Sequence, residues 1–147
     1  QIRTTVFRQL MFAEFELYTH ESFEKGIPLT AEDYNAKWHE LNVKYFGPDM
    51  VVDNDIDIEW ARIPHFYSDF YVYQYATGYA AASAFAKNIL NNEPNAVEKY
   101  VGFLKSGGSD YPIEILKKAG VDMTTSKPLE ATIDRFNELL DMLEKEI

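Results

Sequence analysis

The sequence contains no cysteine among its 147 residues. That absence excludes disulfide scaffolds, thiol nucleophiles and cysteine-ligated zinc sites. Positive charge is also scarce, because 14 Lys and Arg stand against 24 Asp and Glu, which gives a formal net charge of −10. An acidic protein repels phosphate backbones and anionic membranes, so we expect neither nucleic acid nor membrane as a partner. No apolar run approaches the roughly 20 residues that span a bilayer.

The amino-terminal residues lack two further features. The chain begins with Gln1 rather than Met, and no basic segment followed by an apolar segment and small residues marks a signal peptide. We therefore expect a cytoplasmic protein, and we expect this chain to be a piece of a longer one. A catalytic centre of the longer protein can then lie outside these 147 residues.

Aromatic residues, in contrast, are abundant. Ten Tyr, ten Phe and two Trp make up 15% of the chain, which is enough to build a core and excludes a disordered tail. Apolar residues recur at helical spacing, without strand-like alternation or an internal repeat. The pattern predicts an all-α fold of about six helices, in which residues 1–147 form a single helical unit. The predicted helices cover 4–25, 30–45, 67–90, 95–106, 112–120 and 128–147.

The first two predicted helices have clear local signals. An apolar stripe runs along the first helix, which ends at Gly26. Thr30 begins the second, because Asp33 three residues later completes a short-armed capping box, and Gly47 with Pro48 ends it. The stripe of the first helix consists of Val6, Leu10, Phe12, Phe15, Leu17 and Phe23, with Glu14, Glu16, Glu21 and Glu24 between its members.

One segment begins like a zinc-binding motif and is incomplete. His39-Glu40 matches the start of the His-Glu-x-x-His motif of zinc peptidases, in which two His residues on one helical face reach one metal. Val43 stands where the second His is needed, and its side chain cannot bind zinc. We therefore predict an ordinary amphipathic helix with His39 facing solvent.

A second segment begins like a calcium-binding loop. Asp53, Asp55 and Asp57 alternate as in such a loop, but Ile58 and Pro64 stand where Gly and Glu are required. We predict a solvated acidic turn within the irregular stretch 49–64, and no metal ligand in this chain.

The segment 64–75 is the richest in groups that donate or accept hydrogen bonds. It reads Pro-His-Phe-Tyr-Ser-Asp-Phe-Tyr-Val-Tyr-Gln-Tyr. On a helix, Tyr67, Tyr71 and Tyr75 are spaced i, i+4 and i+8 and share one face. Such phenols can hold the carbonyl groups of an extended peptide, and can donate to a developing oxyanion without carrying charge. The same residues also fit an aromatic packing stripe, which residue types alone favour.

Five blocks of the sequence are long and unusual. They are Arg-Thr-Thr-Val-Phe-Arg-Gln (3–9), Met-Phe-Ala-Glu-Phe-Glu (11–16), Glu-Trp-Ala-Arg-Ile-Pro-His-Phe-Tyr (59–67), Tyr-Val-Tyr-Gln-Tyr-Ala-Thr-Gly (71–78) and Phe-Leu-Lys-Ser-Gly-Gly-Ser-Asp-Tyr-Pro (103–112). In this order they resemble the late catalytic domain of the oligoendopeptidase F family, which is similar to thimet oligopeptidase and neurolysin. The resemblance extends over essentially the whole chain.

The resemblance implies the C-terminal portion of a larger, mostly helical metallopeptidase catalytic domain. Such enzymes are zinc-dependent oligoendopeptidases that hydrolyse short peptides inside a closed helical chamber. Their His-Glu-x-x-His motif and third zinc ligand precede the block at 3–9, so the resemblance places the zinc ligands outside this chain. The implied partners are short peptide substrates and the rest of the catalytic domain. The isolated chain is expected to be inactive.

The resemblance also favours a functional role over a packing role for the segment 64–75. In the family, a His and Tyr residues that follow the zinc helices line the cleft and help to stabilise the tetrahedral intermediate. Which Tyr is the oxyanion donor stays open, because the His-to-Tyr spacing is shorter here than in thimet oligopeptidase. The matching positions imply catalytic roles for His65, Tyr67 and Tyr71, and substrate-binding roles for Tyr73 and, at lower rank, for Tyr75 and Arg62.

A different class of protein fits the residues as well. Neither a nucleophile triad nor a complete set of metal ligands can be assembled from this sequence. A free-standing helical module that holds peptides without chemistry is therefore the alternative to a peptidase fragment.

Overall fold

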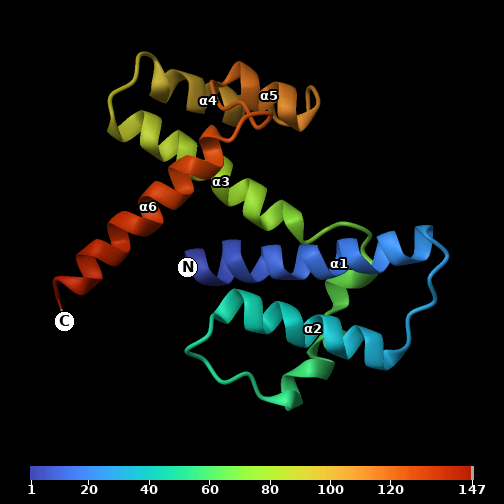
Figure 1. Ribbon diagram of the computed structural model, residues 1–147. Helices are drawn as coiled ribbons and strands as arrows, with labels where there is room; N and C mark the ends of the chain where they lie inside the picture. Colours follow the sequence, from blue (N-terminus) through green and yellow to red (C-terminus); the bar gives the residue numbers. More distant parts are fainter. Residues whose placement is uncertain (147) are drawn as a thin grey trace. The chain divides into compact units, whose positions relative to one another are not determined.

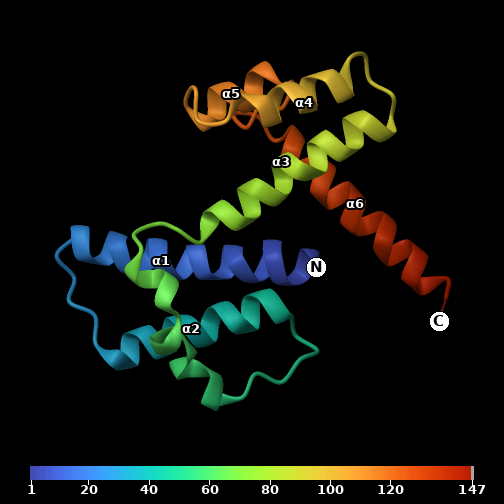
Figure 2. The same cartoon turned by 180° about the vertical axis from the view of Figure 1, so that it is seen from behind.

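The computed structural model describes residues 1–146 and shows a helical chain, drawn from two sides in Figures 1 and 2. No strand occurs between residues 1 and 146, which confirms the all-α prediction, and no helix in this range is long and apolar enough to cross a membrane. The helices are α1 (Arg8–Glu24), α2 (Ala31–Phe46), α3 (Tyr73–Leu90), α4 (Ala96–Ser106), α5 (Pro112–Lys118) and α6 (Lys127–Glu144). A π-helical segment, η1 (Arg3–Phe7), precedes α1, and two 3₁₀ helices, η2 (Asn54–Arg62) and η3 (Pro64–Tyr67), precede α3.

The chain divides into two compact units. The first is Gln1–Ala76 and the second is Thr77–Ile147, with the boundary inside α3. The expectation that the whole chain forms a single helical unit stays a prediction.

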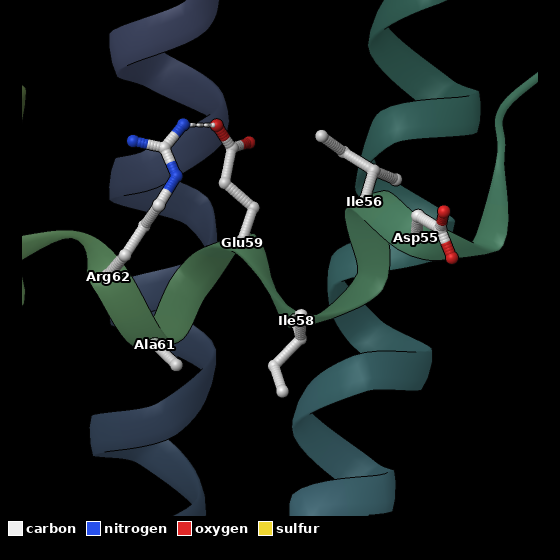
Figure 3. Close-up of a pocket in the computed structure, with 6 residues that line it drawn as sticks. All are labelled: Asp55, Ile56, Ile58, Glu59, Ala61 and Arg62. Atoms are coloured by element: carbon white, nitrogen blue, oxygen red, sulfur yellow. Dashed lines mark hydrogen bonds and ion pairs between the residues drawn. The ribbon is translucent and has the colours of Figure 1, made fainter.

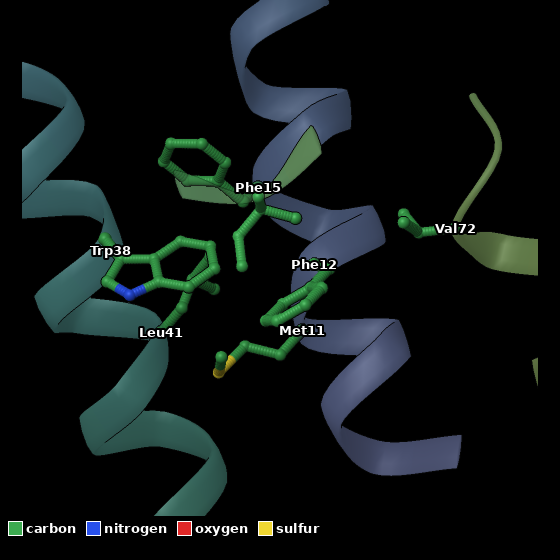
Figure 4. Close-up of a cluster of buried hydrophobic side chains, with 7 residues drawn as sticks. Met11, Phe12, Phe15, Trp38, Leu41 and Val72 are labelled. Atoms are coloured by element: carbon green, nitrogen blue, oxygen red, sulfur yellow. The ribbon is translucent and has the colours of Figure 1, made fainter. Parts of the chain in front are cut away.

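The first unit is built around the two neighbouring helices α1 and α2 and the 3₁₀ helix η2, which packs on α2. Figure 4 shows rings from both helices meeting in its core: Phe15 and Trp38 have centroids 4.9 Å apart, and Phe12 and Trp38 5.2 Å apart. Burial of such large rings is the main source of stability in a small helical unit. The buried members of this core are Met11, Phe12, Phe15, Trp38, Leu41, Ile63 and Val72.

The apolar stripe predicted for the first helix is only partly correct. Phe12 and Phe15 are buried, but Leu17 is 49% exposed and Phe23 84% exposed. Glu16, which the pattern places among polar residues, is only 2% exposed. It lies four residues after Phe12 and therefore on the same helical face. This buried carboxyl becomes important at the candidate site.

The predicted beginning and end of α2 are confirmed. The hydroxyl oxygen of Thr30 accepts the backbone N–H of Asp33 at 3.3 Å, and the Asp33 carboxylate accepts the backbone N–H of Thr30 at 2.8 Å. This reciprocal pair satisfies two N–H groups that a helix leaves without partners at its start. Gly47 follows the helix at φ 81°, a conformation that suits glycine.

Both tryptophans belong to the first unit. The Trp38 indole is fully buried, and its Nε1 has no hydrogen-bond partner. The indole N–H of Trp60 donates to Oδ1 of Asn35 at 2.8 Å.

The second unit has a smaller core between α3, α4 and the end of α5. Its buried members are Ala81, Phe85, Ala119 and Val121, with the rings of Tyr100 and Phe103 packed on Phe85 at 5.2 and 5.1 Å. On the exposed side, Lys87 of α3 pairs with Asp134 of α6 at 2.7 Å.

Candidate active site

The segment 64–75 is not the continuous helix that the spacing predicts. Tyr67 ends η3, Tyr71 lies in the connection after it, and Tyr75 lies in the first turn of α3. The prediction that these three residues share one helical face is therefore wrong. Asp69 and Phe70 break the helix, because both adopt left-handed backbone angles, with φ of 43° and 54°.

The turn nevertheless brings three of the predicted site residues together. The rings of His65 and Tyr71 stack with centroids 5.7 Å apart and planes 21° apart. Tyr75 stands edge-on to both, at 5.9 Å from His65 and 5.5 Å from Tyr71. Its hydroxyl lies 3.3 Å from Nε2 of His65. We call His65, Tyr71 and Tyr75 the aromatic cluster.

The hydroxyl groups of Tyr71 and Tyr75 interact with each other. A side-chain hydrogen bond with Tyr71 raises the pKa of Tyr75, and burial and the Tyr71 charge add to the effect. The Tyr75 hydroxyl thus lies between the imidazole of His65 and the phenol of Tyr71. The Tyr71 ring is 41% exposed, so a ligand can reach its hydroxyl.

Two core residues anchor the cluster in the first unit. The ring of Phe66, next to His65, packs on Phe12 and Phe15 at 5.8 and 5.3 Å. Val72, next to Tyr71, is fully buried. Neighbouring residues thus point in opposite directions, one into the core and one towards the surface.

The remaining predicted site residues lie outside the aromatic cluster. Tyr67 is 85% exposed, and its hydroxyl makes no hydrogen bond within residues 1–146, so it is free to bind a ligand. Tyr73 is 46% exposed at the start of α3.

Arg62 is engaged in an ion pair. Figure 3 shows its guanidinium directed at the Glu59 carboxylate, beside a pocket of about 420 Å³ on η2. The Arg62 side chain is 71% exposed and the Glu59 side chain only 6%. The same Glu59 oxygen binds Arg8 of α1 at 2.6 Å, whereas the other oxygen is buried without a partner. No hydrogen bond or ring contact in the described part of the chain joins Arg62 to the aromatic cluster.

Sequence reasoning missed the residues of α1 that support this region. The buried Glu16 accepts the backbone N–H of Phe70 at 2.8 Å, and the His20 ring lies 4.3 Å from the Phe70 ring. The signal for Glu16 was its position four residues after Phe12, on the buried face of the helix. Nothing in the local sequence shows its partner, which is 54 residues away.

The described residues do not fit a metal site. Among residues 1–146, no three His, Asp or Glu side chains converge to hold an ion. The prediction that His39 faces solvent needs correction, because its side chain is 33% exposed and Nδ1 lies 2.7 Å from Oδ1 of Asp57. Asp57 thereby joins η2 to α2 rather than lying in a solvated turn, and Asp53 caps η2 by accepting the N–H of Asp55.

Comparison with known proteins identifies the class. Residues 2–135 match Peptidase family M3, so the chain is a segment of a peptidase. It belongs to peptidase family M3, and its resemblance to oligoendopeptidase F is confirmed by individual relatives.

Oligopeptidase PepF of Bacillus subtilis is 54% identical over 97% of this chain, and Group B oligopeptidase PepB of Streptococcus agalactiae is 49% identical over 95%. The crystal structure of oligoendopeptidase-F from Enterococcus faecium superposes with a TM-score of 0.95 at 52% identity, covering 98% of this chain and 28% of that one. The chain spans 21% and 23% of the two curated relatives, so it corresponds to part of a larger peptidase.

Proposed function

We propose that this chain is the C-terminal part of the catalytic domain of a zinc-dependent oligoendopeptidase that hydrolyses short peptides. Its part in the reaction is to bind the substrate and to stabilise the oxyanion. The observation that carries the proposal is the aromatic cluster, in which the rings of His65, Tyr71 and Tyr75 pack together and the Tyr71 ring is exposed.

The chemistry follows from the charge that develops during peptide hydrolysis. Attack on the scissile carbonyl converts its oxygen into an oxyanion, which a positioned neutral donor stabilises more than it stabilises the ground state. In this proposal Tyr71 donates to this oxygen, and the stacked His65 ring and the edge-on Tyr75 ring hold the Tyr71 ring in position. Tyr67 is the second candidate donor, because its hydroxyl is free and exposed.

The other site residues extend the contact with the peptide. Tyr73 offers an exposed phenol at the start of α3, and Arg62 has guanidinium donors beyond the one that binds Glu59. We assign both to substrate binding away from the scissile bond.

The zinc ligands and the remaining walls of the active site belong, in this proposal, to the part of the enzyme outside this chain. Large apolar side chains that are exposed here fit contacts with that part. On α1, Leu17 and Phe23 are 49% and 84% exposed. On α6, Leu140 and Leu143 are 41% and 53% exposed. We also propose a cytoplasmic location for the enzyme, which cell fractionation tests.

Conservative variants of the whole enzyme test the catalytic role. Tyr71→Phe keeps the ring and removes the donor, so we expect kcat to fall about 10²–10³-fold with little change in KM. His65→Ala is expected to act in the same direction, and Tyr67→Phe measures the share of the second candidate. Tyr111→Phe is the matched control, because Tyr111 is 81% exposed and lies near α5. Unchanged kcat in Tyr67→Phe, Tyr71→Phe and Tyr73→Phe together would assign these rings to packing.

The second candidate function is a helical peptide-binding module without catalysis. The observation that favours it is the lack of a convergent metal-ligand set within residues 1–146. Peptide binding by the chain, combined with a whole protein that has no hydrolytic activity, would support it. Peptidase activity that a chelator abolishes in the whole protein would exclude it.

A further inference from the structure

The turn between η3 and α3 decides whether the aromatic cluster can form. His65 precedes this turn, and Tyr71 and Tyr75 follow it. Within it, Asp69 and Phe70 adopt φ of 43° and 54°. Two consecutive residues other than glycine in the left-handed region are unfavourable, so such a turn persists only where surrounding contacts hold it.

One buried side chain provides the contact that holds the turn. Glu16 of α1 is 2% exposed, and its Oε1 accepts the backbone N–H of Phe70 at 2.8 Å. His20, one helical turn further along α1, contacts the Phe70 ring with centroids 4.3 Å apart. These two residues of α1 therefore bind the backbone and the side chain of the same left-handed residue.

Burial disfavours the charged form of the Glu16 carboxyl. Burial raises its pKa, and the nearby Asp69 charge raises it further, whereas the Phe70 N–H and His20 lower it. An apolar residue at this helix position would bury its side chain without that penalty. Within residues 1–146, the hydrogen bond to the Phe70 N–H is the one that the Glu16 carboxyl makes and an apolar side chain could not.

We infer that Glu16 is a positioning residue for the aromatic cluster: by binding the Phe70 N–H it fixes the turn that stacks Tyr71 on His65. The significance of this role for peptide hydrolysis rests on the function proposed above. The geometric role itself concerns only residues of the first unit.

Two substitutions of Glu16 separate the hydrogen bond from packing and charge. Glu16→Gln keeps an acceptor oxygen at the same position, whereas Glu16→Leu keeps an apolar stem and removes the acceptor. Glu24→Leu is the matched control, because it makes the same replacement at an exposed position of α1. NMR spectroscopy of the purified chain then measures hydrogen exchange at the Phe70 amide and the nuclear Overhauser effects between the His65 and Tyr71 rings.

We expect Glu16→Gln and Glu24→Leu to retain both signals. We expect Glu16→Leu to speed exchange of the Phe70 amide by about tenfold or more and to lose the His65–Tyr71 effects, with the rest of the helical spectrum preserved. Ring contacts that persist in Glu16→Leu would overturn the inference.

A second variant covers the case in which Glu16→Leu does not fold. Glycine adopts φ near +54° without the penalty that Phe70 has, so Glu16→Leu/Phe70→Gly is expected to fold and to restore the His65–Tyr71 contact. A double variant that remains unfolded would contradict the inference. Kinetics of the whole enzyme are separate: a displaced cluster with unchanged kcat would refute the proposed catalytic role and leave the positioning role intact.

Discussion

The hydroxyl of Tyr45 donates to Oε2 of Glu14 at 3.0 Å and thereby joins the end of α2 to α1. Lys44 binds both oxygens of the same carboxylate at 2.7 and 2.9 Å. Burial opposes ionisation of Glu14, but the bonds from Lys44 and Tyr45 outweigh it and lower its pKa. Burial and the bond to Glu14 raise the pKa of Tyr45 to about 12.

This raised pKa predicts a loss of stability in alkali. A phenol that holds its proton more tightly in the folded state contributes stability that is fully present below about pH 10 and is lost as pH rises through about 12. Because Tyr45 is only partly buried, we expect this contribution to be about 1–2 kcal/mol. Urea unfolding of the wild type and of Tyr45→Phe at pH 8 to about 12 measures it. Their difference in unfolding free energy should shrink over this range, and a constant difference would contradict the prediction.

The ion pairs of Glu59 predict that Glu59→Ala and Arg62→Ala differ in their effect on stability. Its side chain is 6% exposed and binds both Arg8 and Arg62, whose side chains are 30% and 71% exposed. We expect Glu59→Ala to lower the free energy of unfolding by about 2–3 kcal/mol, because it leaves the half-buried Arg8 without its partner. Arg62→Ala should cost less than about 1 kcal/mol, since its charge is at the surface. Equal effects in chemical denaturation would show that the pairing with Arg8 is unimportant.

The capping box at the start of α2 predicts a small loss of stability when the Thr30 hydroxyl is removed. Thr30→Ala removes the oxygen that accepts the Asp33 N–H, and we expect a loss of about 1 kcal/mol in thermal or urea unfolding. Thr30→Ser keeps the oxygen and serves as the control, with stability close to that of the wild type. A loss of the same size in Thr30→Ser would point to the methyl group instead of the cap.

The placement of the imidazoles predicts weak metal binding by the isolated chain. His20, His39 and His65 do not converge with other ligands in the described residues, and zinc requires about four ligands within bonding distance. We expect the purified chain to contain substoichiometric zinc by elemental analysis and to cleave no peptide. The whole enzyme is the positive control. Stoichiometric zinc in the chain, or cleavage inhibited by a chelator, would contradict this prediction.

The helices were predictable where their ends are marked locally. Thr30 with Asp33, Gly47 and Pro112 carry the signals of caps, turns and first helical positions, and α2 and α5 begin where these residues predict. The acidic segment after Gly47 was harder, because a pattern of Asp residues fits both a solvated turn and the 3₁₀ helix η2 that His39 stabilises through Asp57.

The candidate site was predictable in its residues but not in its arrangement. His65, Tyr71 and Tyr75 were selected from their side-chain chemistry and from the family resemblance. Their mutual positions depend on the left-handed turn at Asp69 and Phe70, and a distant carboxyl of α1 binds that turn. Helical periodicity describes only neighbours within a few residues, so it extended α3 back to Tyr67, six residues before its actual start at Tyr73.

Because both indoles lie in the first unit, tryptophan fluorescence can test whether the whole chain unfolds cooperatively. Selective excitation of tryptophan reports only on residues 1–76, where Trp38 is enclosed by the rings of Phe12, Phe15 and Phe66. Far-ultraviolet circular dichroism reports on the helices of both units. Coincident denaturation curves would mean that the two units unfold as one cooperative body, and separated curves would mean two independent folding units. Two native fluorophores thus suffice to measure how the chain is divided, without any added label.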